Sequence, residues 1–257
     1  MPLSELIFEN DLLAMLDPES RTRLAIMGSL ITWSAGTVLF EPDDLMDAVL
    51  FPLGGSLATL IVTVSGNVSA EAALIGRNGM VSRYVGDRPV PAFARITVAQ
   101  GGRFLRIALS DFTAAERLSP AITDIAARFA ECLTAQLLQS AACNAVHSLE
   151  QRTARWLLAA ADHTGSQYIS VTQEQLGALL GAGRSYTSRQ IQRFKAERLV
   201  RTRRGGIVIV DYDGMATHAC ACHEHIQRHV ATMLHEHVQP SRPIAGAQTD
   251  QSLRDAG

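Results

Sequence analysis

"LLGAGRSYTSRQIQRFKAERLVRTRRGGIVIV", residues 179–210, joins a glycine bend, a basic segment and a run of aliphatic residues. Just upstream, Thr172 is followed by three leucines that lie on one apolar stripe at helical spacing. Thr172 stands where an N-cap is expected, because acidic and amide residues occupy the turn that follows it. Gly181-Ala182-Gly183 then ends this first helix in a tight bend.

A second helix is predicted from about Arg184 to Arg198, with Ile191 and Phe194 on its apolar side. Two helices joined by a short glycine turn are typical of a helix-turn-helix motif. Gly177, in the first helix, is the small residue that lets the second helix cross close to it. The pattern therefore predicts a helix-turn-helix over this stretch.

The segment after the second helix predicts a β-hairpin. An arginine-rich strand leads to Gly205-Gly206, and the aliphatic run 207–210 returns as the second strand. A helix-turn-helix followed by a basic hairpin is a winged helix. Three arginines of the hairpin are expected near DNA phosphates: Arg201, Arg203 and Arg204.

A nucleotide-binding loop is the alternative interpretation of Gly181-Ala182-Gly183, and the surrounding residues exclude it. The glycines follow a helix instead of a strand, and no third glycine stands at the spacing of a dinucleotide fingerprint. The Lys-Ser/Thr pair of a Walker A loop is absent, since the only lysine of the chain is Lys195. No catalytic constellation of nucleophile, paired carboxylates or metal-ligating histidines stands out elsewhere. The sequence predicts a protein that is not an enzyme.

Charge is unevenly distributed along the chain. The 257 residues carry a formal net charge of −2, yet residues 147–210 hold ten Lys and Arg against four Asp and Glu. Such local basic charge is expected of a module that binds a polyanion, although a solvated arginine-rich face would look the same. The chain has no apolar run long enough for a membrane span and no basic signal-peptide start, and its four cysteines are too few for a disulfide scaffold. We expect a cytoplasmic protein.

The second helix carries the residues expected to read bases. Its N-terminal part presents two arginines and two serines on one exposed face: Arg184, Ser185, Ser188 and Arg189. Arginine can bridge the O6 and N7 acceptors of guanine, and serine can contact several bases. Arg193 and Lys195 lie further along the helix, better placed for phosphate or solvent.

The helix-turn-helix and the segments before it resemble a known family. "VTQEQLGALLGAGRSYTSRQIQRFKAERLVRTRRGGIVIVD", residues 171–211, resembles the winged helix of the Crp/Fnr superfamily of bacterial transcription regulators, and "LEQRTARWLLAAADHTG", residues 149–165, is similar to the helix before it. More loosely, "ITWSAGTVLFEPDD" and the segment 48–82 are similar to the family's cyclic-nucleotide-binding-like β-roll.

The resemblance implies a function and a set of contacts. A member of this family binds double-stranded DNA as a homodimer and can act with RNA polymerase. The base contacts it implies fall on Arg184, Ser185, Ser188 and Arg189, with backbone contacts near Thr172 and Gln173. The positions of Arg193 on the second helix and of Arg203 and Arg204 in the hairpin add these three to the expected DNA-binding residues. The chain departs from the family where Thr187 and Gln190 replace apolar residues and where Ser185 replaces a base-reading glutamate.

The N-terminal half is expected to form the sensor. Short β-branched or apolar runs separated by glycines predict a roll of short strands. The family's phosphate-binding cassette, Gly-Glu and then Arg-x-Ala, is not present: no glutamate follows Gly79, and Arg95 precedes Ile96-Thr97. A buried cyclic phosphate would lack its compensating arginine, which argues against cyclic AMP. We expect an unknown small effector, and no cofactor is predicted.

A long helical pattern follows the β-rich half. An apolar stripe runs along it at i, i+3, i+4 and i+7 spacing: Ile122, Ile125, Phe129, Cys132, Leu133, Gln136, Leu137 and Ser140. Such a stripe suits pairing between two copies of the helix, and the resemblance implies the same. The alternative is that the stripe packs only within one chain.

The predicted fold class is α+β, with an N-terminal double-stranded β-roll, a long dimerisation helix and a C-terminal winged helix-turn-helix. We expect the β-roll at residues 1–115, the dimerisation helix at 116–147 and the winged helix at 148–213. A C-terminal helix and a disordered tail, rich in Pro, Gly and polar residues, are expected at 214–257.

Two other interpretations stay open at this point. "HACACHEH", residues 218–225, sets Cys220 and Cys222 among histidines, and sulfur beside imidazole can bind zinc or copper. A thiol- or metal-responsive regulator would use these two cysteines, although a Cys-x-Cys pair on a helix directs its side chains apart. A constitutive DNA binder, with the β-roll only as a scaffold, is the other alternative.

Overall fold

The computed structural model describes residues 3–65, 68–81 and 88–235. The predicted disordered tail lies outside these residues. None of the helices in the described part of the chain combines the length and apolar character needed to cross a membrane.

Short helices that the sequence analysis did not foresee open the chain. They are α1 (Leu3–Leu6), a 3-10 turn (Ile7–Glu9), α2 (Asp11–Ala14) and α3 (Pro18–Met27). Asn10 caps α2 by accepting from the amides of Leu12 and Leu13, and its side-chain amide donates to two carbonyls of the β-rich half. This buried amide therefore fixes the N-terminal helices to the sheets.

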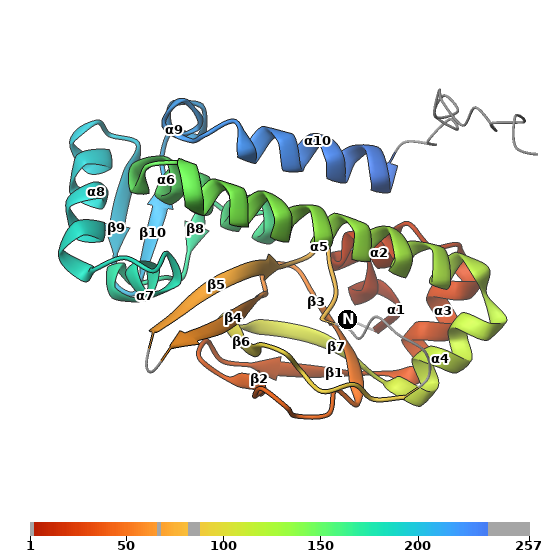
Figure 1. The fold of residues 1–257 in the computed structure, drawn as a ribbon. Coiled ribbons are helices and arrows are strands. Elements are labelled where there is room, and N and C mark those ends of the chain that lie inside the picture. The colour runs from red at the N-terminus through yellow and green to blue at the C-terminus, as the bar shows by residue number, and fades with distance from the viewer. Residues whose placement is uncertain (1–2, 66–67, 82–87, 236–257) are drawn as a thin grey trace, which may run out of the picture.

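Two antiparallel sheets form the N-terminal body and enclose its apolar core (Figure 1). One has the order β1-β7-β3 and the other the order β2-β6-β4-β5. Their strands are β1 (Gly28–Trp33), β2 (Val38–Phe40), β3 (Ala48–Pro52), β4 (Leu57–Ser65), β5 (Val68–Ile75), β6 (Arg95–Gln100) and β7 (Gly102–Ala108). The predicted α+β class with a β-roll is confirmed.

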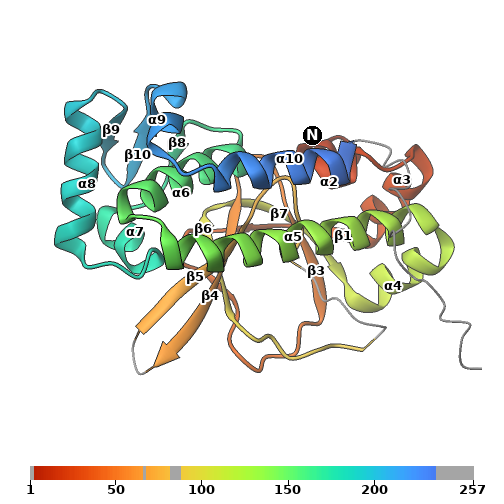
Figure 2. The same ribbon diagram turned by 45° about the horizontal axis from the view of Figure 1, so that its top comes forward.

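Three helices follow the sheets. They are α4 (Leu109–Leu118), which crosses the boundary expected at residue 115, α5 (Pro120–Val146) and α6 (Leu149–Thr164). Helix α5 runs over the β-roll toward the winged helix, and α10 (Cys222–His235) lies beside it (Figures 1 and 2).

Most of the predicted apolar stripe of α5 faces its own chain. Ile122, Ile125, Phe129, Cys132, Leu133 and Ser140 are all buried, and the five apolar members up to Leu133 belong to the core of the β-roll. Of the other two members, Gln136 is half-buried and Leu137 is exposed. The interpretation of the buried side chains as a seam between two copies is therefore wrong, and the alternative of packing within one chain holds for them. The spacing of apolar residues predicts the helix correctly, but it does not show which part of the protein the buried face contacts.

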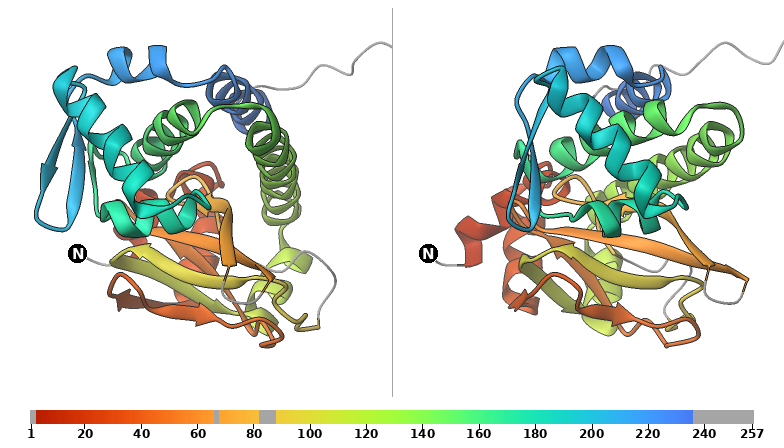
Figure 3. Two further views of the ribbon diagram at one scale, coloured as in Figure 1. Left: turned by 60° about the vertical axis from the view of Figure 1, so that its left-hand side comes forward. Right: turned by 90° about the vertical axis from the view of Figure 1, so that its left-hand side faces the viewer.

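The winged helix forms the other end of the molecule. Its elements are β8 (Tyr168–Ile169), α7 (Gln173–Leu179), α8 (Arg184–Ala196), β9 (Val200–Arg203), β10 (Gly206–Ile209) and α9 (Tyr212–His218). The predicted two helices and hairpin are confirmed, and β8 adds a third strand in the order β8-β10-β9. Figure 3 shows the hairpin beside α8 at the edge of the molecule.

Helix α6 joins the β-roll to the winged helix. Trp156 donates its indole N–H to a carboxylate oxygen of Glu71 on β5, at 2.7 Å, and Thr59 on β4 donates to the other oxygen at 3.1 Å. At the far end of α6, the ring of His163 is 2.5 Å from the amide oxygen of Asn78. These side-chain contacts hold the middle and the end of α6 against the β-roll.

Glu71 generates a prediction about pH and stability. Burial raises the pKa of its carboxyl to about 7, and the hydrogen bonds from Trp156 and Thr59 and the charge of Arg155 offset this only in part. Because the folded-state pKa lies above the unfolded value, the ionised carboxyl destabilises the fold as the pH rises from about 4.5 to 7. We expect Glu71→Gln to raise the free energy of unfolding by about 1–3 kcal/mol at pH 8 and to change it little at pH 5.

Urea unfolding at both pH values measures this difference. Glu131→Gln, at an exposed position of α5, removes the same charge without the buried setting and serves as the control. A loss of stability in Glu71→Gln at pH 8 would mean that the carboxylate is needed in its charged form.

Candidate nucleic-acid interface

The first helix of the motif begins at a reciprocal cap. The hydroxyl of Thr172 accepts from the amide of Gln175 at 3.1 Å, and the side-chain oxygen of Gln175 accepts from the amide of Thr172 at 2.9 Å. The N-cap predicted at Thr172 is confirmed. Thr172 is exposed and Gln173 is half-buried at this end of α7, where the resemblance implies backbone contacts.

The bend between the two helices depends on small residues. Gly181 adopts a φ of 63°, which a residue with a side chain would enter only with strain. A Cβ on Gly177 would lie 3.1 Å from both the carbonyl oxygen of Ala182 and the hydroxyl of Thr187. The close approach of the helices expected at Gly177 is thus present, and Thr187 satisfies its buried hydroxyl on the carbonyl of Gly183 at 3.4 Å.

The expected reading face of α8 is open to solvent. Arg184, Ser185 and Arg189 are exposed, and Ser188 is half-buried between them. Arg184 makes a long ion pair with Glu174, at 3.7 Å. The guanidinium of Arg189 lies 5.2 Å from the ring centroid of Tyr186, a distance at which a cation and an aromatic face attract.

Arg193 is in a different setting from the other basic residues of α8. Its guanidinium donates to Glu150 of α6 at 2.6 Å and to Glu197 at 3.0 Å, and His218 of α9 lies at 3.0 and 2.9 Å from the same two carboxylates. These pairs hold the C-terminal half of α8 against α6 and α9. A phosphate would have to compete with both carboxylates for Arg193.

Two residues of this surface were missed in the sequence analysis. Tyr186 is 45% exposed, and its ring orders Arg189. Gln192 is exposed and stands four residues after Ser188, on the same helix face. Both residues are exposed and lie within one turn of the predicted residues. The sequence could have identified them only if the buried side of α8 had been known.

The wing carries free positive charge. Arg201, Arg203 and Arg204 are all exposed on or beside β9, and Gly205 turns the hairpin with a φ of 77°. Within the described part of the chain, no carboxylate forms an ion pair with any of these three arginines. They remain available to an anionic partner.

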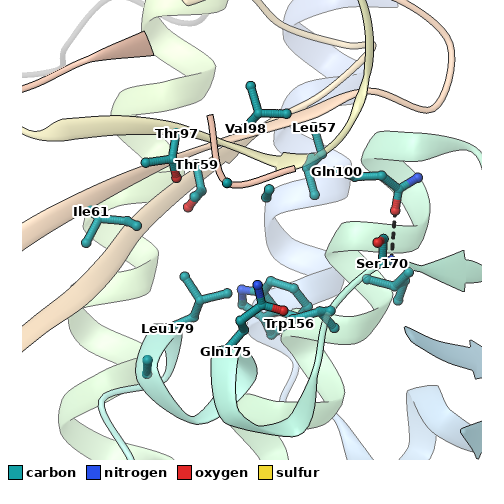
Figure 4. A pocket seen from close by; sticks show the side chains of 15 residues that line it. Leu57, Thr59, Ile61, Thr97, Val98, Gln100, Trp156, Ser170, Gln175 and Leu179 are labelled. Atoms are coloured by element: carbon teal, nitrogen blue, oxygen red, sulfur yellow. Dashed lines mark hydrogen bonds between the residues drawn. The ribbon is translucent and has the colours of Figure 1, made fainter. Parts of the chain in front are cut away.

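A cavity of about 200 Å³ lies between the β-roll and the winged helix (Figure 4). Leu57 and Thr59 of β4 form one wall, and Trp156 of α6 and Leu179 of α7 form the other. At its rim, the side-chain oxygen of Gln100 accepts from the amide of Ser170 at 2.9 Å. None of the described residues that line the cavity is charged, so it suits an uncharged, mostly apolar molecule.

Arg95 does not form part of a phosphate cradle. It lies exposed at the start of β6 and donates to Glu41 at 2.7 Å. This placement accords with the missing cassette in the sequence.

The two cysteines of residues 218–225 meet two residues of α5. Their sulfurs lie with the sulfur of Cys143 and the ring of His147 in one group. Cys220 precedes α10 and is not helical, so the expected divergence of a helical Cys-x-Cys pair does not occur. The neighbouring histidines go elsewhere: His218 pairs with carboxylates and His223 lies 3.3 Å from Asp162. Burial raises the pKa of the Cys220 and Cys222 thiols, which are therefore neutral at pH 7 when nothing binds them.

Known proteins resemble this chain in its helix-turn-helix sequence and in its fold. The family model of the Crp-like helix-turn-helix domain matches residues 151–217. A Crp/Fnr-family regulator from Eubacterium rectale is similar in structure, with 18% identity, a TM-score of 0.57 and coverage of 84% of this chain and 97% of that one. FixK2 from Bradyrhizobium japonicum has 11% identity and a TM-score of 0.64, with 76% and 98% covered.

A third solved structure is CLP of Xanthomonas campestris, described as a c-di-GMP responsive global regulator. It has 14% identity and a TM-score of 0.59, with 75% of this chain and 99% of that one covered. No curated protein matches the chain in sequence. At these identities the structures establish a shared fold, and the family model identifies the helix-turn-helix domain.

Proposed function

We propose that the chain is a Crp/Fnr-type transcription regulator that binds a palindromic operator as a homodimer, acts in the cytoplasm and responds to a small effector other than cyclic AMP. Its Crp-like helix-turn-helix domain and the fold that it shares with Crp/Fnr-family structures support this proposal. The observation that carries the proposal is the exposed face of α8. Two exposed arginines stand there, Arg189 and Arg184 with its long pair to Glu174, beside a wing with three more. Direct reading of bases by α8 and phosphate contacts from the wing follow from this arrangement.

We assign the base contacts to Arg184, Ser185, Ser188 and Arg189, with Tyr186 and Gln192 added from the exposed face of the helix. Backbone contacts fall to Thr172 and Gln173 at the start of α7 and to Arg203 and Arg204 in the wing. Arg193 has two carboxylate partners, so we rank it below the others as a phosphate ligand.

The homodimer is proposed through the exposed side of α5. Apolar or small side chains stand there at helical spacing, in a stripe opposite to the one buried on the β-roll: Ala127, Leu138, Ala141, Ala142, Ala145 and Val146. Leu138 is 68% exposed and Val146 77%. Two such helices, paired about a two-fold axis, would present two copies of α8 to major grooves about one turn apart, roughly 34 Å.

The effector is proposed to occupy the cavity between the β-roll and α7. A molecule there would touch the sheet of the sensor and the first helix of the helix-turn-helix at once, and it could favour one arrangement of the two over another. CLP, a structural relative, is described as responsive to c-di-GMP. The uncharged lining of this cavity indicates a less polar ligand for this chain.

The division of the chain is proposed as expected from the sequence: a sensor at 1–115, a dimerisation helix at 116–147, the winged helix at 148–213 and a C-terminal segment at 214–257.

RNA polymerase is the proposed further partner of the DNA-bound dimer. A constitutive DNA binder with the β-roll as a scaffold is the alternative. Thermal-shift screening of small apolar molecules distinguishes the two, because a specific ligand raises the Tm by mass action.

The first prediction concerns sequence recognition. Selection of random duplexes by the full chain is expected to yield a palindrome, and Arg189→Ala should weaken binding to it by about 1–3 kcal/mol while relaxing one position in each half-site. Arg95→Ala removes a positive charge from the β-roll and should leave both affinity and sequence preference in place. Equal preference for selected and scrambled DNA in the wild type would sink the proposal.

The second prediction concerns the wing. A residue that contacts only phosphate contributes to affinity for every sequence and to its dependence on salt. Arg203→Ala should lower affinity for specific and nonspecific duplexes alike and reduce the slope of log K against log salt by about 1. A change in the selected sequence, with the slope unaltered, would place Arg203 on a base.

The third prediction concerns assembly. Leu138→Glu puts charge into the proposed interface and should convert the dimer into a monomer with weakened operator binding, as measured by sedimentation and by titration with the palindrome. Leu45→Glu, at an exposed leucine of the β-roll, is the matched control and should leave the dimer intact. A dimer that survives Leu138→Glu at the same dissociation constant would exclude this face of α5.

A further inference from the structure

Four side chains with soft or borderline ligand atoms meet at the junction of α5 and α10. Cys143 lies in the last turn of α5, and His147 is the C-cap of the same helix. Cys220 precedes α10, and Cys222 is its first residue. The three sulfurs and the imidazole nitrogen all lie within 4.8 Å of one another, although more than seventy residues separate the two pairs in sequence.

The distances fit a tetrahedral metal ion. The sulfurs of Cys143 and Cys220 are 3.5 Å apart, and the sulfur of Cys222 is 3.6 Å from Nδ1 of His147. A zinc ion with Zn–S bonds of about 2.3 Å and a Zn–N bond of about 2.0 Å requires ligand atoms roughly 3.5–3.8 Å apart. Cys₃His is one of the sets that hold structural zinc, so little movement would be needed to close the site.

The backbone holds these ligands in place before any ion binds. The amide of His147 donates to the carbonyl of Cys143 at 3.0 Å, which keeps the two side chains on one side of the helix end. The amide of His223 donates to the carbonyl of Cys220 at 3.2 Å and shapes the turn into α10. All three cysteines are buried, whereas His147 is half-buried and gives the ion a route from solvent.

A hydrogen-bond donor next to the four side chains would stabilise the negative charge of metal-bound thiolates. The side-chain amide of Gln139 donates to the sulfur of Cys222 at 3.0 Å, as second-layer donors do around metal-bound thiolates. Three thiolates and one imidazole around Zn²⁺ carry a net charge of −1, which a hydrogen-bond donor such as Gln139 offsets in part.

We propose that Cys143, His147, Cys220 and Cys222 bind one Zn²⁺ per chain. Binding replaces the three thiol protons, which pass to solvent, by three Zn–S bonds. The ion would fasten the start of α10 to the end of α5, beside the short His147–Ser148 connection to α6. The proposal does not depend on DNA binding or on the effector.

A disulfide is the competing use of two of these sulfurs. A bond between Cys143 and Cys220 would leave Cys222 and His147 without a reason to converge on the same point, and it would need an oxidant. The four-ligand arrangement accounts for all of them. The described part of the chain also provides a matched control in Cys132, a buried cysteine of α5 outside the group.

The test measures metal in the full-length protein, purified anaerobically without chelator. Elemental analysis should find about one zinc per chain in the wild type and in Cys132→Ser, and less than about a tenth in Cys143→Ser and Cys220→Ser. Replacement of zinc by Co²⁺ should give the intense d–d absorption near 600–750 nm that marks tetrahedral thiolate ligation, and the two ligand variants should lose it.

Thermal unfolding keeps the test decisive if a variant folds poorly. Chelation of the wild type should lower its Tm, and stoichiometric Zn²⁺ should restore it, whereas Cys143→Ser should respond to neither. Absence of bound zinc before and after reconstitution, with no cobalt spectrum, would overturn the proposal. So would a Cys143–Cys220 disulfide in the anaerobically purified protein.

Discussion

Helix α6 is buried against two bodies at once, and the position of every functional surface depends on that double contact. Leu157 and Ala161 join the core of the winged helix, and Leu57 and Leu74 of the β-roll belong to the same apolar cluster. The β-roll and the winged helix are therefore not separate bodies on a flexible tether in this arrangement. A shift of α6 on the sheet would move α8 and the wing with it.

Polar contacts fix the position of α6 between the β-roll and the winged helix. Glu71 holds Trp156 near the middle of the helix, Asn78 holds His163 near its end, and Glu150 at its start holds Arg193 of α8. A neutral Glu71 carboxyl makes these contacts with a smaller desolvation cost than an ionised one. Burial lowers the pKa of His163 to about 4, so this contact is made by a neutral ring near pH 7. The orientation of α8 thus rests on a few polar contacts of α6 instead of on the wing or the bend alone.

The local features of the fold could be predicted from the sequence because their causes are local. Thr172 and Gln175 cap each other three residues apart, Gly181 permits a φ that other residues resist, and Gly205-Gly206 turns a hairpin between neighbouring strands. Long-range packing could not be predicted in the same way. The apolar period of α5 identifies a helix, but whether Phe129 meets its own β-roll or a second copy depends on segments far earlier in the chain, such as the one around Gly79.

The same reasoning applies to the cysteines. The spacing of Cys220 and Cys222 makes them candidate ligands in the sequence. His218 beside them pairs with Glu150 instead, and the other two candidate ligands are Cys143 of α5 and His147 at its C-cap. Cys143 and His147 are four residues apart, a spacing that puts two side chains on one helix face, yet nothing in one sequence joins them to a pair more than seventy residues later. Only the antiparallel course of α10 along α5 brings them together.

The central claim is that α8 reads bases in the major groove from two copies of the chain related by symmetry. Dimethyl sulfate methylates guanine at N7 in the major groove and adenine at N3 in the minor groove, so protection of the selected operator reports which groove is occupied. The account predicts one protected guanine N7, or a cluster of them, in each half-site, with the two centres about one helical turn apart. Protection confined to adenine N3, or to a single half-site, would contradict it.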